Sequence, residues 1–223
     1  MCGIAGFSLK ENLNQKENIL KVMNDKLSHR GPDGEGFYHD SNVSLAHKRL
    51  AILDLNERSN QPFFDNKKEY AIVFNGEIYN YLELKKILKD DGFIFDTTGD
   101  TEVLLNSYIK WGLNFLQKIK GMFSFAIYDV KKKQILCARD HFGQKPFFYY
   151  YKNGNFIFSS ELTSLISNPI IKEKICIKSV SNYLHYDSFV GSSTPITNCY
   201  KLLPSEYLIT KYHHSTIFES ILL

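Results

Sequence analysis

The chain has 223 residues, a formal net charge of +3 and 43% hydrophobic residues, which indicates a folded protein with a substantial core. Lysines and arginines are scattered, so no nucleic-acid surface is expected, and no apolar run reaches the ~20 residues that cross a bilayer. The four cysteines lie far apart without a C-x-x-C pair, which favours a reduced, cytoplasmic protein over an exported, disulfide-bonded one.

The first half of the chain alternates between strand-like and helix-like segments. Strands are expected over residues 2–9 and 69–80, one or two strands over 43–55, and helices over 15–28, 82–91 and 100–111. Asn75-Gly76 predicts a turn in the segment 69–80, because this dipeptide is common in hairpin loops. Asp100 is expected to cap the third helix.

From residue 121 the hydrophobic period changes from helical spacing to two. This pattern predicts four strands joined by short turns, an antiparallel meander, with the lysines at 131–133 in the first turn. Weaker patterns predict a helix over 178–186, a loop over 191–195 and a strand over 206–212. Hairpins interleaved with helices indicate the α+β class, in which helices cover antiparallel sheets.

The opening segment MCGIAGF suggests a nucleophile at the chain terminus. Methionine is usually removed before a small second residue, and Cys2 would then carry a free α-amine. The unperturbed pKa of such an amine, ~7.7–8.0, leaves part of it neutral at pH 7 and able to accept the thiol proton. The alternative is that Cys2 is simply a small, buried residue near a chain end.

A cysteine that attacks an amide generates an oxyanion, and FNGE at 74–77 offers donors for it. The Asn75 side chain and the Gly76 backbone N–H could both donate to that oxyanion, although a plain turn is the alternative. Arg49, in an otherwise apolar strand, could hold a carboxylate, or it could face outward with a surface partner. Asp100 and Glu77 could bind an ammonium group; otherwise Asp100 is a helix cap and Glu77 is solvated.

No metal or nucleotide site is expected. The histidines stand alone in the sequence or, at 213–214, lie side by side, and neither arrangement has the spacing of metal ligands. The glycine-rich phosphate-binding motifs are also missing from the chain. We therefore expect no cofactor bound by this chain.

Nine blocks occur in a specific order along the chain: MCGIAGF, SHRGPDGEG, LAHKRLAILDL, QPF, IVFNGEIYNY, TTGDTEVLL, GMFSFAIYD, ARDHFGQKPFFYY and FSSEL. Together they resemble the glutaminase domain of glutamine-hydrolysing asparagine synthetases, which are class II glutamine amidotransferases. The resemblance implies an N-terminal nucleophile hydrolase fold, a four-layer sandwich with helices outside two stacked antiparallel sheets. It covers about residues 2–210, which we expect to form one glutamine amidotransferase domain. The tail, 211–223, is expected to be the start of a missing synthetase domain or a truncation.

The resemblance also implies a role for each matching residue. Cys2 aligns with the nucleophile, and Asn75 and Gly76 align with the oxyanion donors. The substrate-binding residues that it implies are Arg49, Ile52 and Leu53 for the α-carboxylate and Glu77 and Asp100 for the α-amine of glutamine. Three positions depart from the family pattern: His141, Gln144 and Ser205.

The expected function is hydrolysis of L-glutamine to glutamate and ammonia. In a full asparagine synthetase the ammonia converts aspartate to asparagine, with ATP and magnesium bound by a synthetase domain or chain. That domain's Ser-Gly-Gly-x-Asp-Ser loop does not occur in this sequence. Two alternatives stay open: an amidotransferase for another acceptor, such as a cell-surface sugar, and a non-catalytic glutamine-binding module. A homodimer is possible in each case.

Overall fold

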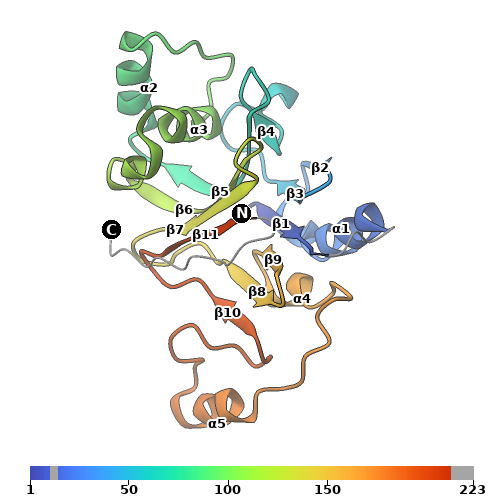
Figure 1. Cartoon of the computed structure of the whole chain (residues 1–223). Coiled ribbons are helices and arrows are strands. Elements are labelled where there is room, and N and C mark those ends of the chain that lie inside the picture. Colours follow the sequence, from blue (N-terminus) through green and yellow to red (C-terminus); the bar gives the residue numbers. More distant parts are fainter. Residues whose placement is uncertain (11–14, 212–223) are drawn as a thin grey trace.

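The computed structural model describes residues 1–10 and 15–211. Two antiparallel sheets lie face to face, and helices cover their outer faces (Figure 1). The order of layers is therefore helix, sheet, sheet, helix. This architecture confirms the α+β class that the sequence patterns indicate and the four-layer sandwich that the resemblance implies.

The first sheet has six strands in the order β10-β8-β9-β1-β3-β2. Their bounds are β1 Gly3–Ser8, β2 Gly34–His39, β3 Ser44–Arg49, β8 Phe148–Lys152, β9 Asn155–Ser159 and β10 Cys199–Lys201. The first strand of the chain lies between β9 and β3, and Ile4 is opposite His47 of β3. The chain therefore begins near the middle of a sheet.

The second sheet has five strands in the order β11-β7-β6-β5-β4. Their bounds are β4 Phe63–Phe64, β5 Tyr70–Ile78, β6 Gly121–Asp129, β7 Gln134–Arg139 and β11 Tyr207–Lys211. β5 pairs with β6 over its whole length, whereas β4 pairs with only two residues of β5, Ala71 and Ile72. The other edge of β5 is therefore left without a strand neighbour beyond Ile72 in the described structure.

Helices lie on the outer side of each sheet. Their bounds are α1 Lys16–Asp25, α2 Tyr81–Asp90, α3 Asp100–Trp111, α4 Leu162–Leu165 and α5 Ile177–Tyr186, with 3₁₀ turns at Ser28–Arg30, Glu57–Ser59 and Gly112–Gln117. α1 and α4 pack against the six-stranded sheet, and α2 and α3 pack against the five-stranded sheet. α5 lies at the end of the molecule far from α2 and α3 (Figure 1). No helix in the described part of the chain is long and apolar enough to cross a bilayer.

Three buried clusters separate the four layers. In β5, Phe74 packs toward α3 and Val73 packs between the sheets. In β1, Ile4 lies between the sheets and Ala5 packs toward α1. Successive side chains of a strand point to opposite faces, so the register of β1, β3 and β5 decides which residues enter the space between the sheets.

Most of the helix predictions are confirmed, with small shifts at the ends. α1, α2, α3 and α5 occupy the four segments for which a helix is predicted. The N-cap of α3 is Gly99, and Asp100 is the first residue of the helix, so the capping role predicted for Asp100 is wrong. The Asp100 carboxylate instead accepts a hydrogen bond from the Ile78 backbone, which lies at the end of β5.

The prediction of a single meander after residue 121 is wrong. β6 and β7 form a hairpin in the five-stranded sheet, whereas β8 and β9 form a hairpin in the six-stranded sheet. Residues 140–147 have no strand structure and connect β7 of one sheet to β8 of the other. Local periodicity predicts each hairpin because its partners are adjacent in sequence, but it carries no information about which sheet the hairpin joins.

The turn predicted at Asn75-Gly76 is also wrong. Both residues lie inside β5, opposite Ser124 and Phe123 of β6. A side chain on Gly76 would clash with the Met122 carbonyl oxygen, so this glycine allows close approach of two strands rather than a reversal of the chain.

The strand predicted over 43–55 ends earlier than expected, at Arg49, and a loop with one 3₁₀ turn follows it. The last predicted strand is observed as β11, Tyr207–Lys211. Residues 212–223, most of the predicted tail, lie outside the described residues. The domain boundary at residue 210 stays a prediction.

Candidate active site

Side chains alternate between the two faces of each strand, and this alternation directs Cys2, Arg49 and Asn75 into the space between the sheets. Cys2 precedes Ile4 by two residues, and Arg49 follows His47 by two, so both share the inner face of the six-stranded sheet. Asn75 follows Val73 by two and shares the inner face of the five-stranded sheet. Three distant segments of sequence therefore meet where the two sheets end.

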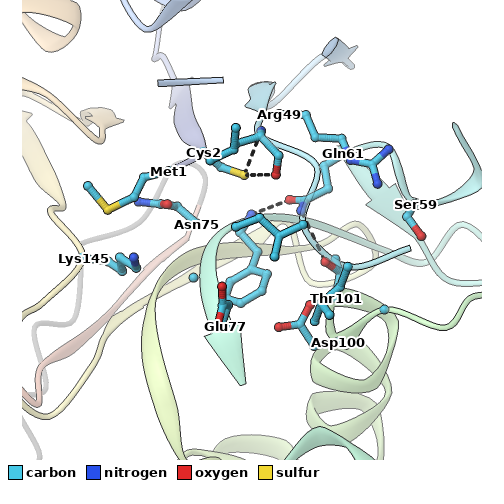
Figure 2. Close-up of a pocket in the computed structure, with 16 residues that line it drawn as sticks. Met1, Cys2, Arg49, Ser59, Gln61, Asn75, Glu77, Asp100, Thr101 and Lys145 are labelled. Carbon is cyan, nitrogen blue, oxygen red and sulfur yellow. Dashed lines mark hydrogen bonds between the residues drawn. The ribbon is translucent and has the colours of Figure 1, made fainter. Parts of the chain in front are cut away.

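A pocket of about 600 Å³, its open mouth included, lies at this meeting point (Figure 2). Its lining contains all eight residues singled out from the sequence: Cys2, Arg49, Ile52, Leu53, Asn75, Gly76, Glu77 and Asp100. Figure 2 shows Arg49 on one side of Cys2, with Met1 on the other side. These eight residues therefore bring a thiol, a guanidinium, two carboxylates and an amide into one pocket.

The Cys2 thiol is half-buried and contacts the backbone of Leu50. The Leu50 N–H lies 3.4 Å from the sulfur, and the sulfur lies 3.6 Å from the Leu50 carbonyl oxygen. Burial raises the pKa of the thiol, although the Leu50 N–H, the positive chain terminus and Arg49 act in the opposite direction. Because the thiol holds its proton, a base must remove that proton before the sulfur can attack.

Arg30 fixes the backbone of Cys2. Its Nε donates to the Cys2 carbonyl oxygen at 3.0 Å, and its Nη1 donates to Glu161 at 2.9 Å. The Arg30 side chain is only 9% exposed, so this ion pair is largely shielded from water. The Arg30 guanidinium therefore helps to fix the position of Cys2, in addition to the pairing of β1 with its neighbouring strands.

The Asn75 side chain is fully buried, and neither its nitrogen nor its oxygen has a hydrogen-bond partner among the described residues. A buried, unpaired amide costs about 1–3 kcal/mol, so such groups are rare unless a ligand or water completes them. Its position beside Cys2 makes the Asn75 amide available to a molecule that enters the pocket.

Arg49, the last residue of β3, is held rigidly by the loop that follows this strand. Its Nη1 donates to the Asn56 carbonyl oxygen at 2.9 Å and to the Asn60 side chain at 2.7 Å, and its Nη2 donates to the Asp54 carbonyl oxygen. These bonds use three of its five N–H groups, which leaves one N–H on Nη2 and the Nε–H. Arg49 is 8% exposed, so the outward-facing alternative is wrong.

The Asp54 carboxylate holds the same loop in place. It accepts hydrogen bonds from the Thr98 backbone at 2.7 Å and from the Arg58 side chain at 3.1 Å. Burial opposes its ionisation, but these bonds and one from Asn56 outweigh that effect and lower the pKa of Asp54. Ile52 and Leu53, at the mouth of the pocket, are 57% and 36% exposed.

Asp100 lies at the start of α3, and its carboxylate accepts the Ile78 N–H at 2.9 Å. Burial raises the pKa of Asp100 to about 6; the Ile78 N–H works against this rise, and the charge of Glu77 adds to it. Two neighbouring carboxylates favour a cation between them, because a positive charge offsets their repulsion and stabilises the ionised form of the buried Asp100.

Five further residues matter to the site and were missed as site residues in the sequence. They are Arg30, His47, Gln61, Thr101 and Lys145; Gln61, Thr101 and Lys145 line the pocket itself. All five lie in the ordered blocks, namely SHRGPDGEG, LAHKRLAILDL, QPF, TTGDTEVLL and ARDHFGQKPFFYY, and that position is the signal that could have found them. Within residues 1–10 and 15–211, no group of three or more His, Cys, Asp or Glu side chains could hold a metal ion.

Comparison with known proteins agrees with this geometry. The glutamine amidotransferase domain family matches residues 1–219. The chain is 40% identical to glutamine-hydrolyzing asparagine synthetase 3 of Bacillus subtilis over 78% of this chain and 29% of that protein. It is 37% identical to glutamine-hydrolyzing asparagine synthetase B of Escherichia coli over 74% of this chain and 30% of that protein. The chain thus spans less than a third of the length of these relatives.

The fold also matches a solved structure, a glutamine phosphoribosylpyrophosphate amidotransferase from Bacillus subtilis complexed with ADP and GMP. The TM-score is 0.68 at 21% sequence identity, over 97% of this chain and 49% of that chain. The likeness shows that the fold is that of the N-terminal nucleophile hydrolases. With the family match over nearly its whole length, the chain belongs to the glutamine amidotransferase domain family.

Proposed function

We propose that the chain hydrolyses L-glutamine to glutamate and ammonia, with Cys2 as the nucleophile. The observation that carries this proposal is the unpaired, buried amide of Asn75 in the same pocket as the Cys2 thiol. A glutamine side chain placed between them would present its carbonyl carbon to the sulfur and its carbonyl oxygen to the amide. That arrangement is the one amide cleavage requires.

The charges of the pocket support a free amino acid as the substrate. The unused N–H groups of Arg49 would bind the α-carboxylate, helped by the backbone near Ile52 and Leu53. Glu77 and Asp100 would bind the α-ammonium group, which offsets the repulsion between them. Each charged group of the substrate thus has a partner of opposite sign.

The first half of the reaction forms a thioester. After removal of Met1, the neutral α-amine of Cys2 accepts the thiol proton, and the sulfur attacks the side-chain carbonyl carbon of glutamine. The oxyanion that results accepts hydrogen bonds from the Asn75 side chain and the Gly76 N–H. The C–N bond then breaks, and the α-ammonium returns its proton to the leaving ammonia.

The second half regenerates the thiol. The α-amine removes a proton from water, and the hydroxide attacks the thioester carbonyl carbon. The same two donors stabilise the second oxyanion, the C–S bond breaks, and the sulfur recovers the proton. One glutamine and one water therefore yield one glutamate and one ammonia.

The first prediction concerns Asn75→Ala. One oxyanion donor is typically worth ~2.7–4 kcal/mol, so kcat for ammonia release should fall by about 10²–10³, while KM for glutamine changes less. Ammonia and glutamate are both measured, and intact mass verifies that each preparation lacks Met1. Cys2→Ala should release no ammonia at all.

The matched control for this substitution is Asn66→Ala, because Asn66 is an exposed residue outside the pocket. Its turnover should equal that of the parent chain. If Asn75→Ala turns glutamine over at the parental rate, Asn75 does not stabilise the oxyanion and the proposed arrangement is wrong. If the chain binds glutamine without releasing ammonia, it is a binding module instead.

The fate of the ammonia is a second part of the proposal. We propose that a synthetase domain or chain uses it, with ATP and magnesium, to convert aspartate to asparagine. The support is that relatives about 40% identical are named glutamine-hydrolyzing asparagine synthetases and extend well beyond the matched region. All four cysteines are free, which supports a reducing, cytoplasmic location.

A further inference from the structure

Side chains, rather than a strand, satisfy the edge of β5 beside the pocket. β4 is only two residues long, so it does not extend to Phe74. The Phe74 N–H donates to Gln61 Oε1 at 2.6 Å, and the Phe74 carbonyl oxygen accepts from His47 Nε2 at 3.2 Å. Both main-chain groups of this residue are therefore held by side chains, which leaves room for the pocket where a strand would otherwise continue.

The two side chains connect Phe74 to the rest of the site. His47 is fully buried in β3, opposite Ile4. Gln61 is 7% exposed, and its Nε2 donates to Thr101 Oγ1 at 3.3 Å in the first turn of α3. Burial lowers the pKa of His47 to about 3, so the ring is neutral and Nε2 carries the proton that it donates.

The Asn75 side chain depends on this backbone for its orientation. It follows Phe74 directly, and its amide has no side-chain or main-chain partner of its own among the described residues. An amide without partners is oriented only by its backbone and by packing. A shift in the Phe74 backbone would therefore be transmitted directly to the proposed oxyanion donor.

We propose that His47 and Gln61 are positioning residues that hold the Phe74 backbone and thereby direct the Asn75 amide toward the oxyanion. This inference rests on the proposed function. Gln61 lines the pocket, but its amide oxygen already binds Phe74 and one amide hydrogen is directed at Thr101. It acts through Asn75 rather than on the substrate, so its loss should lower kcat more than it raises KM.

The test is a double-mutant cycle in the full chain, with Gln61→Leu and Asn75→Ala separately and together. Gln61→Leu should lower kcat for glutamine by about 10–100-fold, the loss typical of a misplaced catalytic group, with little change in KM. In the Asn75→Ala background the same substitution should lower kcat much less, because the donor that Gln61 positions is already absent. His47→Leu should behave in the same way, and His47→Gln, which keeps an N–H donor, should recover part of the loss.

The matched control is Asn80→Leu. The Asn80 amide also links two backbone groups, donating to Lys118 O and accepting from Lys120 N, both at 2.9 Å, but it lies outside the pocket. Asn80→Leu should destabilise the chain without changing kcat.

Thr101→Val is a smaller change that serves as a second test variant if Gln61→Leu or His47→Leu prevents folding. It removes only the acceptor for Gln61 Nε2, and it should lower kcat in the parent but not in the Asn75→Ala background.

The outcomes distinguish a failure of the positioning role from a failure of the proposed function. If Asn75→Ala loses turnover but Gln61→Leu and Thr101→Val keep it, the positioning role is wrong and the proposed function stands. Equal fold losses in the parent and Asn75→Ala backgrounds also overturn the positioning role, because they indicate a general structural effect. If Asn75→Ala itself keeps parental turnover, both the donor assignment and the inference fail.

Discussion

In its proposed role, Asn75 would favour function at a cost in stability. The Asn80 amide, by contrast, is paired through both of its polar atoms with the backbone on either side of Ile119. The Asn75 amide is buried without a partner among the described residues, although water could have satisfied it at the surface. A group that costs about 1–3 kcal/mol in this state is best explained by a substrate that completes it.

The ionisation of Asp100 predicts how the affinity for glutamine depends on pH. In its proposed role the carboxylate must be ionised to bind the α-ammonium group of glutamine. Because burial raises its pKa to about 6, protonation competes with binding below that pH. The affinity for glutamine should therefore fall as pH decreases below about 6, by up to tenfold per pH unit, and this group should have little effect above it.

Glutamine binding to the Cys2→Ala chain, measured by calorimetry across this range, tests the prediction without turnover. Asp100→Asn should bind glutamine more weakly at neutral pH and lose most of the pH dependence. An Asp100→Asn chain that keeps the full pH dependence would assign it to another group, with Glu77 the first to examine.

At the scale of elements, Gly76 links the strand pairing to the site. A Cβ atom on this residue would lie 2.7 Å from Phe123 Cα and would also clash with the Met122 carbonyl oxygen. These are backbone atoms of β6 and cannot rotate away. Gly76→Ala should therefore force β5 and β6 apart, lower the free energy of unfolding by about 1–3 kcal/mol and reduce turnover.

Gly34→Ala is the matched control, because Gly34 also lies in a strand but the nearest atom to its added Cβ is 3.8 Å away. It should leave stability unchanged or raise it slightly. Urea unfolding of both variants provides the measurement. Equal stability of the two alanine variants would show that the β5–β6 pair tolerates a side chain at Gly76.

Periodicity predicts those elements whose stabilising contacts are local. α1 and α3 bury regular apolar positions, and β6 and β7 pair across a short turn, so the sequence near each one is sufficient. Sheet membership of β8 and β9 depends on pairing with β1 and β10, which are distant in sequence. β4, with two residues, is too short to produce a period.

The same limit applies to the site. Cys2, Arg49 and Asn75 can be proposed because their residue types are unusual where they occur and because the ordered blocks resemble a known family. Gln61 and His47 act on the backbone of Phe74, which is 13 and 27 residues away. Backbone atoms carry no sequence signal, so contacts of this kind emerge only from the folded chain.

At the scale of the whole molecule, the site lies where the two sheets meet, so buried groups serve the core and the site together. His47 lies between the sheets, and Asp100 lies between β5 and α3. Burial disfavours the charged form of both side chains. The stability of the fold and the protonation state of the site are therefore coupled.

The free energy of unfolding should show two opposite effects of pH. The pKa of His47 is lowered by burial from 6.5 to about 3, so over this range the unfolded chain binds a proton that the folded chain does not, and stability falls as pH decreases. The pKa of Asp100 is raised by burial from 3.8 to about 6, so over that range the folded chain binds the extra proton, and stability rises as pH decreases. Each effect amounts to at most about 1.4 kcal/mol per pH unit, and they nearly cancel where they overlap.

Single substitutions should separate the two effects in urea unfolding at several pH values between about 4 and 7. Relative to the parent chain, His47→Gln should gain stability as pH falls from about 6 to 4, because it removes the destabilising proton uptake of the unfolded state. Asp100→Asn should lose stability over the same range, because it removes the compensating uptake in the folded state. All other titrating groups are common to the three chains and cancel in the differences. A His47→Gln curve parallel to the parent would mean that His47 accepts a proton inside the fold, and a parallel Asp100→Asn curve would mean that Asp100 titrates normally despite its burial.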